Sequence, residues 1–180
     1  MDLVEILLTG IALSMDACAI SMTNAMIHRN KHLRLVEMAF WFGLFQGLMP
    51  VLGFMLGDTF ADVISVIGKY LVLVIFCAIG GKMLQEAFMK EEHEKSPKEL
   101  THKLLLIQAV ATSIDAFAIG VGFSASGADI ILAACVIAIT TFLLSLVAIV
   151  IGNKFGDMLG KKAEGLGGII LILLGIKSLV

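Results

Sequence analysis

The chain has 180 residues, of which 59% are hydrophobic and 16% charged, and its formal net charge is −2 at pH 7. Soluble domains are about 45–50% apolar and about 25% charged, so this composition excludes an ordinary soluble domain. It indicates a polytopic protein of the lipid bilayer. No cluster of Lys and Arg is dense enough to predict nucleic-acid binding. The three cysteines are isolated in apolar segments, which predicts neither a disulfide nor a cysteine-based metal site.

Several stretches of the chain are long and apolar enough to cross a membrane, which takes about 20 residues in a helix. In chain order they cover residues 3–27, 35–57, 63–88, 103–125, 130–152 and 164–180. The segment 90–102 is the one long polar connection, and its Pro97 is typical of a linker. The sequence therefore predicts an all-α integral membrane protein with six transmembrane helices.

The second half of the chain repeats the first. Residues 12–20 (ALSMDACAI) and 111–119 (ATSIDAFAI) are identical at six of nine positions, and Asp115 follows Asp16 by 99 positions. Three helices in each half would insert the second half with the opposite orientation, giving an inverted repeat. The expected organisation is a first three-helix repeat over 1–89, a charged cytoplasmic linker over 90–102, and an inverted second three-helix repeat over 103–180.

Basic residues are distributed unevenly among the predicted loops. When alternate loops are assigned to opposite sides, one side holds every Lys and Arg except Lys69 and Lys177, which is eleven of thirteen. Cytoplasmic loops carry an excess of Lys and Arg. We therefore expect the linker to be cytoplasmic and both termini to lie outside the cytoplasm.

Two carboxylates lie near the middle of predicted spanning helices. A charge at such a depth costs about 2.5–3.5 kcal/mol on insertion scales, so Asp16 and Asp115 invite a functional explanation. Gln46 precedes Pro50 by four residues, where a backbone carbonyl would be free, and Thr112 lies near Asp115. Oxygen ligands without a His in any span favour Mg²⁺, Ca²⁺ or Mn²⁺ over Zn²⁺ or Cu⁺. We predict a metal site formed by these two aspartates with Gln46 and Thr112.

The paired carboxylates also predict how transport is driven. Two carboxylates at close range repel each other unless a metal or a proton neutralises them, so metal and protons should compete. This predicts a secondary transporter with protons as the counter-ion, no catalytic residue and no cofactor. The alternatives are export of another small cation or an amino acid by the same fold, or an intramembrane aspartyl protease. Asp115 lacks the Gly-x-Gly-Asp context of such proteases, which favours transport.

Several motifs of the chain together resemble a known family. They are Ser-Met-Asp-Ala at 14–17, Phe42-Gly43 with Gln46 and Met49-Pro50, Gly80-Gly81-Lys82, Thr-Ser-Ile-Asp-Ala-Phe-Ala-Ile-Gly-Val-Gly at 112–122, and Gly-Lys-Lys-Ala-Glu at 160–164 before Gly167-Gly168. On these residues the whole chain resembles the MntP family of bacterial manganese efflux pumps, within the LysE-like transporters. The resemblance implies a multi-pass protein of the bacterial inner membrane that exports Mn²⁺ as its substrate, with Asp16 and Asp115 essential. Some members carry Glu in place of Gln46.

Overall fold

The computed structural model describes residues 3–28, 30–56, 70, 73–81, 84–85, 100–126, 129–159 and 163–177. Its helices are α1 (Leu3–Ile27), α2 (His32–Leu56), α4 (His102–Thr112), α5 (Ile114–Ser126), α6 (Ile130–Leu159) and α7 (Ala163–Lys177). Residues 73–81 are also helical, and no strand occurs among the residues described. The prediction of an all-α protein is confirmed.

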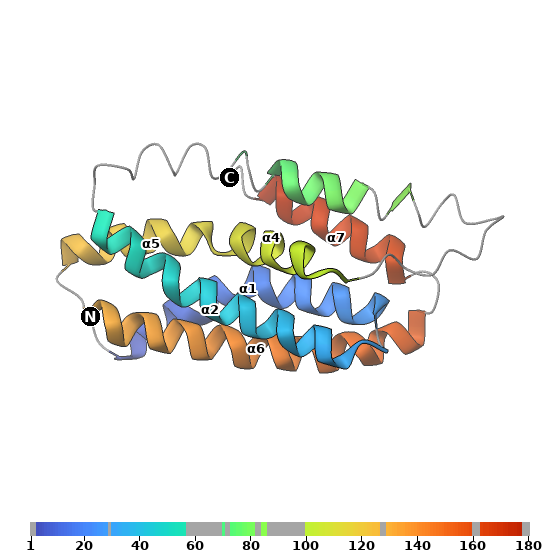
Figure 1. Cartoon of the computed structure of the whole chain (residues 1–180), viewed down its shortest axis with the longest axis horizontal. Helices are drawn as coiled ribbons and strands as arrows, with labels where there is room; N and C mark the ends of the chain where they lie inside the picture. Colours follow the sequence, from blue (N-terminus) through green and yellow to red (C-terminus); the bar gives the residue numbers. More distant parts are fainter. Residues whose placement is uncertain are drawn as a thin grey trace.

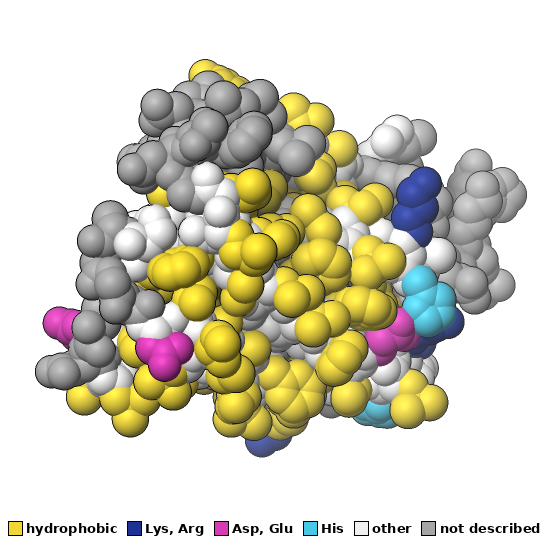
Figure 2. Space-filling model, turned by 60° about the vertical axis from the view of Figure 1, so that its left-hand side comes forward, with side chains coloured by type: hydrophobic (Ala, Val, Ile, Leu, Met, Phe, Trp, Pro, Cys, Tyr) yellow, Lys and Arg dark blue, Asp and Glu magenta, His cyan; other side chains and the backbone are white. Residues whose placement is uncertain are grey.

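Four stretches of helix are long and apolar enough to cross a membrane: Leu3–Ile27, His32–Leu56, His102–Ser124 and Ile130–Phe155. Large apolar side chains are exposed along them, as at Leu33 (88%), Met55 (76%) and Ile131 (71%). Figure 2 shows hydrophobic side chains spread over the face in view, with charged ones mostly toward its edges. A soluble monomer rarely exposes such an apolar surface. The chain is therefore a membrane protein.

The other two predicted spans, the third and the sixth, are not among these four stretches. The third, 63–88, lies largely outside the described residues, although its helical part 73–81 packs against α7, as the neighbouring ribbons in Figure 1 show. The sixth, 164–180, corresponds to α7, which has 15 residues. At ~1.5 Å per residue, α7 is about 22 Å long, less than the ~30 Å hydrocarbon core. The complete set of six spanning helices stays a prediction.

The long helices pack in a bundle in which α1 contacts α6 most extensively, and α2 contacts both α6 and α5 (Figure 1). Glycines make the closest approaches. A Cβ built on Gly53 would lie 2.1 Å from the carbonyl oxygen of Phe117, and one on Gly152 would lie 2.3 Å from that of Met22. Small residues allow such backbone contact between membrane helices. Nothing larger than glycine fits at these two crossings without moving a helix.

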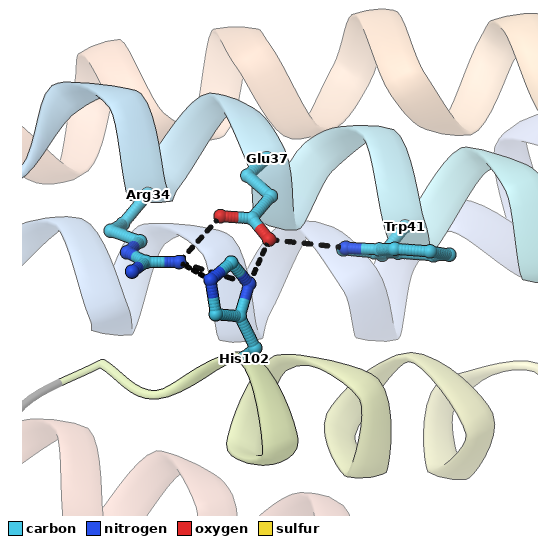
Figure 3. A network of polar contacts seen from close by, with 4 residues as sticks. All are labelled: Arg34, Glu37, Trp41 and His102. Carbon is cyan, nitrogen blue, oxygen red and sulfur yellow. Dashed lines mark hydrogen bonds and ion pairs between the residues drawn. The ribbon is translucent and has the colours of Figure 1, made fainter.

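A polar network joins the start of α2 to the start of α4 (Figure 3). Arg34 Nη1 lies 2.9 Å from Glu37 Oε2, and Trp41 Nε1 donates a hydrogen bond to Glu37 Oε1 at 3.4 Å. His102 contacts both Arg34 and Glu37. Because Gly120 of α5 meets Pro50 near the other end of α2, the α4–α5 segment runs alongside α2 in the same direction.

Candidate functional site

Asp16 lies in the middle of α1 and has a partner from the far end of the chain. Its Oδ1 accepts a hydrogen bond from Lys177 Nζ at 2.9 Å, which is also an ion pair. Lys177 belongs to the last turn of α7. The Asp16 side chain is 27% exposed and that of Lys177 is 65% exposed. From the sequence, Lys177 was predicted only as one of two basic residues on the outer side, so its ion pair with Asp16 was missed.

Asp115 lies in the first turn of α5. Its Oδ1 accepts a hydrogen bond from the Ala116 N–H at 2.8 Å, which fixes the direction of the carboxylate. The charges of both Asp16 and Lys177 act on this carboxylate. Three charged side chains from α1, α5 and α7 thus belong to one electrostatic group. The hydrogen bonds and ion pairs of the described residues do not join the two aspartates directly.

The helix that carries Asp115 is interrupted just before it. Ser113, between α4 and α5, has φ −110° and ψ 5°. Thr112 Oγ1 donates to the carbonyls of Gln108 and Ala109, both at 3.0 Å, and Ser113 Oγ donates to that of Ala109 at 2.8 Å. Hydroxyl bonds to the preceding turn compete with regular helix. The predicted span 103–125 is therefore present as the stretch His102–Ser124, with a local break at Ser113 two residues from the carboxylate.

Gln46 is fully buried in α2, with an exposed fraction of 0%. Its Nε2 donates to the Leu13 carbonyl at 3.0 Å, one turn before Asp16 on α1. Its Oε1 has no hydrogen-bond partner among the described residues. Leaving such an acceptor unsatisfied costs about 1–3 kcal/mol. Pro50 has no N–H to offer the Gln46 carbonyl, so that backbone oxygen also loses its helical donor. Gln46 thus has one buried side-chain acceptor without a partner in the described part of the chain, on an amide held one turn before Asp16.

A second buried polar contact joins three helices and was also missed. Asn24 of α1 donates through Nδ2 to Gln108 Oε1 of α4 at 3.1 Å and to Met38 Sδ of α2 at 3.3 Å. All three side chains are at most 5% exposed. Asn24 within an apolar helix was the available signal, because a buried amide needs partners. The contact ties the helices of the two halves together.

Among the described residues, no group of three or more His, Cys, Asp and Glu side chains could hold a metal ion. A cation at this place would have to be held by the two carboxylates together with neutral oxygens. Thr112 is 2% exposed and its hydroxyl proton points to backbone carbonyls, so it would offer only oxygen lone pairs. Hard cations such as Mn²⁺ accept carboxylate, carbonyl and hydroxyl oxygens.

Comparison with known proteins defines the family. The model of the family described as "Putative manganese efflux pump" matches residues 29–179. The chain belongs to this MntP family. A Ruminiclostridium cellulolyticum protein named "Putative manganese efflux pump MntP" is 43% identical over 182 residues, covering 100% of this chain and 96% of that protein. "Putative manganese efflux pump MntP 1" of Wolinella succinogenes is 44% identical, covering 99% of this chain and 97% of that protein. No solved structure matches.

Membership of the MntP family confirms the resemblance drawn from the motifs. The family is one of transporters, so the chain is not an enzyme. The alternative of an intramembrane aspartyl protease is thereby excluded. A Rippkaea orientalis protein named "Putative manganese efflux pump MntP" is 41% identical, covering 100% of this chain and 97% of that protein, so the similarity spans both halves of the chain.

Proposed function

We propose that this chain exports Mn²⁺ across the bacterial inner membrane in exchange for protons, with Asp16 and Asp115 as the central ligands. The observation that carries the proposal is that Asp16 on α1 and Asp115 on α5 are 99 positions apart in matching sequence surroundings, and that each lies in a stretch of helix long and apolar enough to cross a membrane. These are the acidic residues at the middle of two apolar spans, at equivalent places in the two halves of the chain. The names of the relatives supply the metal.

The neighbouring oxygens complete a ligand set suited to a hard cation. Gln46 Oε1 is buried without a partner, and the amide that carries it is fixed by its bond to Leu13. Thr112 lies at the helix break beside Asp115. Interrupted helices near the middle of the bilayer form the ion sites of many secondary transporters. We assign Asp16, Asp115, Gln46 and Thr112 as ligands of the transported ion.

Proton exchange follows from the charge of this set. Two carboxylates neutralise one divalent ion, which makes the loaded site tolerable in a medium of low dielectric constant. When the ion leaves, the carboxylates repel each other unless protons replace it. Protons entering from outside would therefore promote metal release and return of the empty carrier.

The directions of the helices support an inverted repeat with alternating access. Gly10 faces Ile137 while Gly152 faces Met22, so α1 and α6 run in the same direction, as α2 and α4–α5 do. Adding 99 to the residue numbers of α1 gives those of α4–α5, and adding 99 to those of α2 gives residues within α6. The pair α1 and α6 therefore corresponds to the pair α4–α5 and α2. Gly53 and Gly152, which are 99 positions apart, each meet the helix that carries an aspartate. Both termini would lie outside the cytoplasm, as the positive-inside rule requires.

The test is Mn²⁺ flux into proteoliposomes, with Mg²⁺, Ca²⁺ and Zn²⁺ as competitors. We expect flux in the wild type and its loss in Asp16→Asn and Asp115→Asn. The matched control is Asp129→Asn, because Asp129 caps α6 through the N–H groups of Ile131 and Leu132, and Asn also caps helices well. No flux in the wild type, or flux that neither variant changes, would refute metal transport. Flux indifferent to a pH gradient at fixed voltage would refute proton exchange alone.

A further inference from the structure

The ion pair between Lys177 and Asp16 places a cation of the protein itself at the carboxylate assigned to the transported metal. Lys177 Nζ lies 2.9 Å from Asp16 Oδ1, and its charge also acts on Asp115. An ammonium group and a divalent ion repel each other when both lie within a few Å of one carboxylate, because both are positive. Lys177 and metal therefore compete for Asp16.

The Lys177 side chain is long and flexible enough to move away from Asp16. Lys177 lies in the last turn of α7, is 65% exposed, and holds Asp16 through a single hydrogen bond. Lysine carries its charge on a flexible four-carbon stem, unlike the planar fork of arginine.

We propose that Lys177 is a built-in competitor of the transported ion: it competes with the metal for Asp16 and thereby promotes its release. This inference rests on the proposed function and concerns the same site. Since the metal and the ammonium group oppose each other at this carboxylate, the coupling is reciprocal, and Lys177 weakens metal binding as much as metal weakens the ion pair.

The first experiment measures Mn²⁺ binding to the purified full-length protein in nanodiscs, by the loss of the free-Mn²⁺ electron paramagnetic resonance signal. We expect Lys177→Gln to bind Mn²⁺ about tenfold more tightly than the wild type, a change of about 1.4 kcal/mol. Lys177→Arg should stay closer to the wild type because it keeps the charge. Lys154→Gln, at an exposed residue near the end of α6, is the control for loss of a lysine and should bind as the wild type does.

A second measurement of the same binding uses Lys177→Met, which keeps the apolar stem, where the Gln variant is not monodisperse. A merely structural role for Lys177 would change the amount of folded protein but would not tighten its binding of Mn²⁺.

The outcomes distinguish a failure of the proposed function from a failure of the proposed role of Lys177. Wild-type protein that does not bind Mn²⁺, or binding that Asp16→Asn leaves unchanged, overturns the proposed function. Binding that depends on Asp16 but is equal or weaker in folded Lys177→Gln overturns the role of Lys177 alone. Tighter binding in Lys177→Gln, with unchanged binding in Lys154→Gln, supports it.

Discussion

The crossing of α2 and α5 allows a stability prediction with an internal control. A Cβ on Gly120 would lie 2.1 Å from the carbonyl oxygen and 2.5 Å from the Cα of Pro50, whereas ordinary contacts begin at 3.4 Å. The obstructing atoms are backbone atoms of α2, so no side-chain rotation relieves the overlap. Gly120→Ala must therefore separate the two helices by about 1.3 Å, the difference between 3.4 and 2.1 Å. Gly122, on the same helix, has nothing within 4 Å of its Cβ position.

The expected loss of folding free energy can be taken from overpacking substitutions in other proteins. Extra methyl groups forced into packed regions cost about 1–3 kcal/mol, and a clash between two backbones belongs near the upper end of that range. For a chain of this length, 1 kcal/mol corresponds to a change of about 2–4 °C in Tm. We therefore expect Gly120→Ala to lower Tm by about 4–12 °C. Gly122→Ala should leave Tm equal or slightly raised, because Ala favours helix over Gly.

The assay is the fraction of monodisperse protein after heating in detergent, followed by size-exclusion chromatography across a temperature series. Mn²⁺ flux provides a second readout, since α5 carries Asp115 little more than one turn before Gly120. Equal losses of Tm in both variants would mean that alanine in α5 is harmful in itself. An unchanged Tm for Gly120→Ala would mean that the backbones do not touch at Pro50. Either result refutes the reasoning.

Three further predictions concern polar side chains. Gln46→Leu should weaken Mn²⁺ binding about tenfold, because it removes the unpartnered Oε1, and unchanged binding would contradict its assignment as a ligand. Glu37→Gln should lower Tm by no more than about 4 °C, because its partner His102 is 62% exposed and such pairs contribute at most about 1 kcal/mol. Burial and the charge of Lys31 lower the pKa of His28 from 6.5 to about 4, so stability should fall as pH drops through that range. Tm measured between pH 7.5 and pH 4.5 should fall less in His28→Gln, and an identical fall would contradict the assignment.

Hydropathy predicted the long helices well because the length of an apolar run is a property of the sequence alone. The predicted span 3–27 coincides with α1, and 35–57 differs from α2 by three residues at its start and one at its end. The break at Ser113 could not be predicted in this way. Ser and Thr are accepted in membrane helices, and whether their hydroxyls bend the backbone depends on the packing of the preceding turn.

The site was predictable to the extent that it repeats. Asp16 and Asp115 stand out because each is costly in an apolar helix and because their surroundings match. The partner of Asp16 was not predictable, because a span over 164–180 places Lys177 near the membrane surface. In the structure Lys177 lies in the last described turn of α7, and its ammonium group contacts Asp16 on α1. Such a contact depends on the three-dimensional packing of helices distant in sequence.

The buried polar atoms of α1, α2 and α6 that lack a hydrogen-bond partner among the described residues differ in whether a rotation of the side chain can provide one. The hydroxyls of Thr141 and Ser145 lack partners as drawn, but a hydroxyl rotates freely and can donate to the carbonyl one turn earlier, as Ser14 does to Ile11 at 2.7 Å. The Gln46 oxygen has no such freedom, because its own amide nitrogen is held by the Leu13 carbonyl. Turning the amide would break that bond without providing a donor for the oxygen. A buried acceptor whose direction is fixed in this way is satisfied only by a cation or a water molecule, and the Leu13 carbonyl that fixes it lies one turn before Asp16, which Lys177 contacts.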